Sequence, residues 1–142
     1  TPIISDPGIL LVQKVKIELP ETKIVPVPGA SALLSAIVAS GINAHEFTYL
    51  GFLPHKKGRE TLFKEIKESS RSSVFYESVH RIEKTLDSLV AHLQENRKVV
   101  VAKELTKLFE EVVSGTATEV REYFAHNKDK IRGEFVVIVS GK

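Results

Sequence analysis

The chain has 142 residues, of which 42% are hydrophobic and 27% are charged, and its formal net charge is +2. This composition is typical of a folded domain, and no apolar run approaches the roughly 18 residues of a membrane-spanning helix. Cysteine is absent, which excludes disulfides and thiolate metal sites and is consistent with a reducing compartment. Methionine is absent too, even at position 1, so we expect a processed product or a fragment of a longer protein.

The first part of the chain predicts two helices separated by a short strand. Asp6 and Pro7 are typical of a helix start, and that helix should end before Pro20. Residues 23–27 form a short β-like run that ends at a Pro-Gly break. Residues 31–40 are small and apolar on almost every side, which predicts a buried helix.

A change of composition at residues 42–46 indicates a domain boundary near Ala44. We therefore expect residues 1–43 to be the end of one α/β domain and residues 44–142 to form a second one. Within the second part, Thr116 and Glu119 have the spacing of a helix capping box. Strands are predicted at 47–53, 73–77, 98–102, 110–114 and 135–139, and helices at 60–68, at 81–94 and from Thr116. The fold class is α/β, with a mixed sheet of about five strands and three helices.

Polar segments stand where predicted strands end and helices begin, which is where open α/β sheets bind ligands. Four such segments are residues 1–8, 28–31, 76–81 and 103–107. A carboxylate such as Glu104 could accept a hydrogen bond from a ligand hydroxyl. Each segment can also be explained as a helix cap, a tight turn or a solvated loop, and the residues alone leave both interpretations open.

A compact basic loop, residues 55–59, follows the first strand of the second part. Lysine and arginine side chains in such a loop could bind nucleic-acid phosphates, although a lysine-rich turn is also common in proteins without this role. The five histidines have no metal-ligand spacing, and the glycine-rich nucleotide motifs are absent, so we expect no metal site.

Six segments occur in one order along the chain and together resemble a known family. They are Thr-Pro-Ile-Ile-Ser-Asp-Pro-Gly at 1–8, Pro-Gly-Ala-Ser at 28–31, Gly-Phe-Leu-Pro-His-Lys at 51–56, Tyr-Glu-Ser-Val-His-Arg at 76–81, Glu-Leu-Thr-Lys-Leu-Phe-Glu at 104–110 and Gly-Glu-Phe-Val at 133–136. The chain resembles the ribosomal RNA small-subunit methyltransferase I family, within the tetrapyrrole methylase superfamily. The resemblance implies a class III fold with two α/β domains and S-adenosylmethionine between them. It also implies cytoplasmic methylation of a cytidine 2′-hydroxyl in 16S ribosomal RNA of the 30S subunit.

The resemblance also implies a division of roles among the residues of the six segments. The cofactor-binding residues are expected to be Thr1, Pro2, Ser5, Pro28, Gly29, Ala30, Ser31, Tyr76, Glu77 and Leu105. Glu104 is our candidate base, His80 is the alternative base, and Lys107 and Arg81 would hold phosphate close to the reacting hydroxyl. RNA-binding residues are expected to be Lys56, Lys57, Arg59 and Lys103.

Two further functions remain open at this level. One is methylation of a tetrapyrrole or another small molecule by the same fold, and the other is a non-catalytic RNA-binding or oligomerisation module. The glycine-rich cofactor turn of the family is not in this chain, so we expect the chain alone to be inactive. An open sheet edge and apolar helix faces in residues 1–43 predict a homodimer or a higher oligomer.

Overall fold

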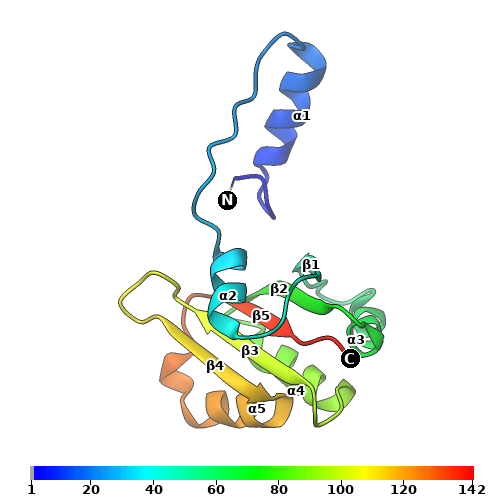
Figure 1. Ribbon diagram of the computed structural model, residues 1–142, viewed down its shortest axis with the longest axis vertical. Coiled ribbons are helices and arrows are strands. Elements are labelled where there is room, and N and C mark those ends of the chain that lie inside the picture. The colour runs from blue at the N-terminus through cyan, green and yellow to red at the C-terminus, as the bar shows by residue number, and fades with distance from the viewer. Residues whose placement is uncertain (1) are drawn as a thin grey trace.

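The computed structural model describes residues 2–142, and its centre is one mixed β-sheet (Figure 1). The strands are β1 (Phe47–Phe52), β2 (Ser72–Ser78), β3 (Lys98–Lys103), β4 (Glu111–Thr116) and β5 (Glu134–Val139). They lie side by side in the order β1-β2-β5-β3-β4. The predicted α/β class and the five strands are therefore confirmed.

The directions of the strands bring three carboxyl ends to one edge of the sheet. β1 is parallel to β2, and β5 is antiparallel to both β2 and β3. It follows that β1, β2 and β3 run the same way, whereas β4 and β5 run in the opposite direction. Segments that follow β1, β2 and β3 are thus neighbours in space, and the start of β5 lies among them.

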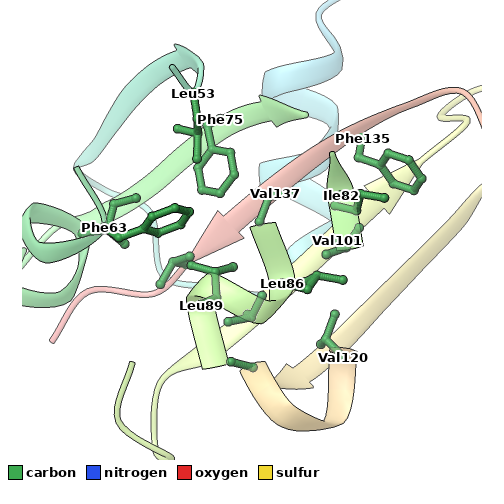
Figure 2. Close-up of a cluster of buried hydrophobic side chains, with 14 of the residues drawn as sticks. Leu53, Phe63, Phe75, Ile82, Leu86, Leu89, Val101, Val120, Phe135 and Val137 are labelled. Atoms are coloured by element: carbon green, nitrogen blue, oxygen red, sulfur yellow. The ribbon is translucent and has the colours of Figure 1, made fainter. Parts of the chain in front are cut away.

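Helices cover both faces of the sheet. One face carries α3 (Arg59–Glu68), α4 (Ile82–His92) and α5 (Ala117–His126), and the other carries α2 (Ala32–Ser40). Figure 2 shows strand side chains such as Val137 meeting Leu86 and Leu89 of α4 on the three-helix side. Because both faces are covered, β3 is apolar on both sides, as a continuous apolar run predicts.

The predicted capping box opens α5 and is confirmed. The Thr116 hydroxyl accepts from the Glu119 N–H at 3.1 Å, and the Glu119 carboxylate accepts from the Thr116 N–H at 2.8 Å. Two N–H groups that the helix itself cannot satisfy are bonded in this way. The cap fixes where β4 ends and where α5 turns back across the sheet.

The predicted strand at residues 23–27 is wrong. These residues are extended, but no strand of residues 2–142 lies beside them, so they have no hydrogen-bonding partner. Pro26 and Pro28 also lack the N–H groups that a ladder requires. The segment connects α1 (Gly8–Glu18) to α2, and Figure 1 shows α1 standing away from the sheet.

The helix expected at residues 31–40 is present as α2, but the expectation that it is buried is wrong. Ala36 is buried against the sheet, but Leu34 is 53% exposed and Val38 is 85% exposed. The reason is that α2 packs on β3, β4 and β5 with one face only. Over residues 2–142, no helix has the length and apolar character needed to cross a membrane.

Candidate ligand-binding cleft

An open cleft of about 450 Å³ lies at the edge of the sheet where β1, β2 and β3 end. The walls come from five regions: the N-terminal turn, the first residue of α2, the ends of β1 to β3, the loop that follows β3, and the start of β5 with the residue before it. The lining residues are Ile4, Ser5, Ala32, Phe52, Tyr76, Ala102, Lys103, Glu104, Leu105, Lys107, Gly133, Glu134, Phe135 and Val136. The volume is within the range of small-molecule sites in proteins.

Glu104 stands at the first position after β3, in an unusual backbone conformation. Its φ is +48° and that of Thr106 is +65°, a left-handed region that non-glycine residues rarely adopt. The turn directs the Glu104 carboxylate toward Gly133, and its side chain is only 18% exposed. Lys107 Nζ lies 3.0 Å from Glu104 Oε1, so a carboxylate and an ammonium group meet at the cleft.

Two aromatic side chains line the cleft, Phe52 from β1 and Tyr76 from β2. The Tyr76 ring lies 5.5 Å from the Tyr49 ring and 5.5 Å from the Phe52 ring, measured between centroids. Tyr49 shares a 2.6 Å hydrogen bond with Ser5, which ties the N-terminal turn to β1. Burial, with the neighbouring Tyr49 adding to it, raises the pKa of the Tyr76 phenol, so this hydroxyl is neutral near pH 7.

Lys103 lines the cleft, but its ammonium group already has partners within the protein. It is 4% exposed, and its ammonium donates to the Phe109 carbonyl at 3.2 Å. The same group lies 3.6 Å from Glu111 Oε2. These contacts close the base of the loop between β3 and β4. The role of Lys103 in RNA binding remains a prediction, and its ammonium would reach a phosphate only by leaving these partners.

Glu77 is directed into the protein and away from the cleft. It is fully buried, and its carboxylate meets Arg81 at 2.8 Å, Thr85 at 2.6 Å and Arg59 at 3.8 Å. Burial lowers the pKa of the Arg59 guanidinium, and the Glu77 charge opposes that shift. A carboxylate enclosed in this way offers no free oxygen to a ligand in the cleft.

The remaining predicted residues lie around the cleft or outside it. Residues 28–31 lead directly into α2, whose N–H of Leu34 donates to the Ser31 hydroxyl at 3.3 Å. His80, Lys56 and Lys57 are exposed and do not line the cleft. The same is true of Pro2, whereas Thr1 lies outside the described residues. The structure thus brings together Ser5, Tyr76, Lys103, Glu104, Leu105 and Lys107.

Sequence reasoning missed several residues of the cleft wall. Phe52 and Gly133 belong to matching segments but had no role assigned to them, and both line the cleft. Tyr49 was only a strand residue, and it lies behind the wall, against the Tyr76 ring and the Ser5 hydroxyl. The signal in the sequence was Gly51, whose φ of +65° goes with the break in the β1–β2 register between Tyr49 and Phe52. Among residues 2–142, no group of three His, Asp or Glu side chains could hold a metal ion.

A mixed sheet with a cleft of this size at its strand ends defines an α/β ligand-binding domain. Residues 1–121 match the tetrapyrrole (corrin/porphyrin) methylases, and the chain belongs to this family. The chain is also similar to ribosomal RNA small subunit methyltransferase I from two bacteria. It is 40% identical to the protein of Buchnera aphidicola subsp. Acyrthosiphon pisum and 42% identical to that of Haemophilus influenzae, over 99% and 100% of this chain. In both cases it spans 50% of the relative.

Solved structures agree with this fold. The methyltransferase CobJ superimposes with a TM-score of 0.70 at 19% identity, over 99% of this chain and 61% of that protein. Uroporphyrin-III C-methyl transferase from Thermus thermophilus, complexed with S-adenyl homocysteine, gives a TM-score of 0.61 at 19% identity. That match covers 98% of this chain and 61% of the enzyme. The expected tetrapyrrole methylase fold is therefore confirmed.

Proposed function

We propose that this chain is part of an S-adenosylmethionine-dependent methyltransferase that modifies the 2′-hydroxyl of a cytidine in small-subunit ribosomal RNA. The observation that carries the proposal is the 40–42% identity, along the whole chain, to proteins named ribosomal RNA small subunit methyltransferase I. The cleft adds chemical support because a carboxylate and an ammonium group meet in it. The 30S subunit would be the partner, and the cytoplasm would be the location.

The cleft fits part of a nucleoside cofactor. Its Tyr76 and Phe52 rings provide a surface for a planar base, and the N-terminal end of α2 offers N–H groups to polar atoms. A Cβ atom added at Gly29 would meet no other atom within 4 Å, so this stretch leaves open space beside the backbone. When bound, S-adenosylmethionine supplies an electrophilic methyl group. Ser5, Tyr76, Leu105 and residues 28–31 would hold it.

The residues of the chain would act on the RNA hydroxyl. Glu104 would accept its proton at the carboxylate as the oxygen becomes methylated. Lys107 would bind the adjoining phosphate and so fix the hydroxyl in line for attack. His80 is the alternative base. These roles need a carboxylate in the cleft and a cation beside it, and Glu104 Oε1 and Lys107 Nζ are 3.0 Å apart.

We further propose that residues 1–43 belong to a first domain and residues 44–142 to a second one, and that this chain alone is inactive. The chain spans half of its curated relatives. Exposed apolar side chains on the first two helices, such as Ile17 at 79% and Val38 at 85%, support a homodimer. A monomer in light scattering at micromolar concentration would count against the dimer.

Calorimetric titration with S-adenosylmethionine and S-adenosylhomocysteine tests whether this half of the site binds cofactor. Heat of binding at micromolar concentration, lost in Tyr76→Ala, would support a pocket that functions in this chain. The control is Tyr123→Ala, which removes a tyrosine of α5 that does not line the cleft. Absence of heat, with the fold intact by circular dichroism, would mean that the chain needs further residues to bind the cofactor.

A further inference from the structure

A basic loop follows β1 and is clamped at its start by two arginines. Arg81 Nη1 donates to the Leu53 carbonyl at 2.8 Å, and Arg59 Nη1 donates to the Pro54 carbonyl at 3.3 Å. Leu53 and Pro54 are the residues through which the chain leaves β1 and enters the basic loop, of which residues 55–58 precede α3. Both ends of the loop are held, because Arg59 is itself the first residue of α3.

The two arginines are held in turn by one buried carboxylate. Glu77 Oε1 lies 2.8 Å from Arg81 Nη2, and Glu77 Oε2 accepts from the Thr85 hydroxyl at 2.6 Å. That hydroxyl also accepts from Arg59 Nη2 at 2.7 Å. The side chains of Arg59 and Arg81 are only 13% and 16% exposed. The terminal nitrogens of both guanidinium groups therefore contact Glu77, Thr85 and the carbonyls of Leu53 and Pro54.

The free cations of this region are on the loop itself. Lys56 and Lys57 are exposed, and within the described part of the chain neither forms an ion pair with an acidic side chain. An exposed, unpaired lysine can meet a phosphate without first losing a partner. Arg59 and Arg81 could do so only by leaving a fully buried carboxylate uncompensated.

The contacts of Glu77, Arg59 and Arg81 lie next to the cleft along the chain. Phe52, the last residue before Leu53, lies opposite Tyr76 in the β1–β2 register, and Glu77 follows Tyr76 directly. Phe52, which lines the cleft, is therefore paired with the residue directly before Glu77, which holds the arginines. A shift of the loop start would move Phe52 along with it.

We propose that Glu77, Thr85, Arg59 and Arg81 form a positioning cluster that holds the basic loop so that Lys56 and Lys57 meet the phosphates of the RNA substrate. This inference rests on the proposed function, because it names the RNA-facing surface of that enzyme. It assigns Arg59 and Arg81 to the loop and not to RNA. It assigns Glu77 to the arginines and not to the cofactor.

The test is a mutant cycle on binding to an unmodified small-subunit ribosomal RNA transcript. Arg81→Lys keeps the charge but loses the planar fork that joins Leu53 to Glu77. Thr85→Val removes the hydroxyl that links Glu77 to Arg59, whereas Thr85→Ser keeps a hydroxyl at this position. Each change is made alone and in a Lys56→Ala/Lys57→Ala background. Arg121→Lys, in the surface ion pair with Asp87, is the matched control for the arginine exchange.

Three results are expected. Arg81→Lys and Thr85→Val each weaken RNA binding by at least about threefold, whereas Thr85→Ser and Arg121→Lys do not. Loss of both lysines reduces the slope of log affinity against log salt by about 1.4 if the bound RNA is single-stranded. In the background without the two lysines, Arg81→Lys and Thr85→Val cause no further loss of affinity, because the cluster acts through the loop.

Two results would overturn the inference. One is an equal fold-loss from the cluster variants with and without the lysines, which would mean direct RNA contact or a general loss of structure. The other is an unchanged RNA affinity in a folded Thr85→Val protein. This second result tests the inference even if the Arg81→Lys variant does not fold. Failure of the proposed function is a distinct result, because the unmutated protein would then bind the ribosomal transcript no better than an unrelated RNA.

Discussion

Gly133 lies so close to Glu104 that a Cβ atom on Gly133 would stand 2.1 Å from Glu104 Oε1. Gly133 immediately precedes β5, and Glu104 immediately follows β3, which is the neighbour of β5 in the sheet. The φ of Gly133 is +71°, so this position favours glycine for its backbone as well as for the space around it. The absence of a side chain at Gly133 therefore lets the Glu104 carboxylate enter the cleft.

Replacing Gly133 with alanine should displace the Glu104 carboxylate. We expect kcat for RNA methylation to fall by about 100-fold, the scale of a misplacement of roughly 1 Å. The left-handed backbone should also cost about 1–2 kcal/mol of stability. Methylation kinetics in the active protein and chemical unfolding measure the two effects separately.

The control for backbone strain is Gly41→Ala. Gly41 has a similar φ of +62°, but a Cβ there would meet only Lys98 Nζ, at 4.0 Å. This variant should lose a similar amount of stability and keep its kcat. If Gly41→Ala and Gly133→Ala reduced kcat equally, the steric account of Gly133 would be wrong.

Replacing Glu104 with glutamine tests its role as the base. The variant keeps the size of the side chain but cannot accept a proton, so kcat should fall by about 10²–10⁴-fold. RNA affinity should change far less, since the amide adds no repulsion of phosphate. Glu110→Gln, in the same loop, is the control and should retain activity. Comparable losses of turnover and of RNA affinity in Glu104→Gln would contradict the role.

Acid should weaken the junction of β4 with the 3₁₀ turn η1 (Lys128–Lys130). Burial alone would raise the pKa of the Glu111 carboxyl, but hydrogen bonds from Lys130 and Tyr123 outweigh it and hold the pKa below the ordinary value of 4.5. A carboxyl with a lowered folded-state pKa stabilises the fold above pH 4.5, and that contribution is lost as the pH falls through the folded-state pKa.

Glu111→Gln should therefore be less stable than the unmutated protein at neutral pH and show a weaker loss of stability on acidification below pH 4.5. Urea unfolding at a series of pH values measures the difference. Glu122→Gln, which changes an exposed glutamate of α5, should leave the pH profile unaltered. Parallel profiles for Glu111→Gln and the unmutated protein would refute the assignment.

The capping box makes a prediction about stability alone. Thr116→Ala removes the hydroxyl that accepts from Glu119, and should cost about 1 kcal/mol. The melting temperature should fall by about 4 °C for a domain of this size. Thr116→Ser keeps the acceptor and should melt close to the unmutated protein. An unchanged melting temperature in Thr116→Ala would mean that α5 does not depend on its cap.

The strands of the second part were predictable because their apolar runs are bounded by clear turns and all of them are paired in the sheet. The run at 23–27 has similar residues but no partner strand among residues 2–142, and sequence pattern alone cannot reveal whether a partner exists. The burial of α2 was overestimated for a related reason. Its small apolar residues are compatible with burial on all sides, yet only the Ala36 side packs on the sheet.

The site was predictable where it follows the ends of strands. Glu104 and Tyr76 were expected beside a ligand because they stand at the carboxyl ends of β3 and β2, and both line the cleft. The direction of a side chain at such a position was not predictable. Glu77 was expected to face the cofactor, but strand alternation turns it to the opposite side of the sheet from Tyr76, where Arg81 encloses it.

The most direct test of the proposed function is transfer of a labelled methyl group from S-adenosylmethionine by the protein that carries this chain. The substrate is 30S subunits that lack the modification, and uroporphyrinogen serves as the competing small molecule. The account predicts that the label is recovered, after nuclease digestion, in 2′-O-methylcytidine, and that Glu104→Gln abolishes most of it. Label in a base, or in the tetrapyrrole and not in RNA, would contradict the account.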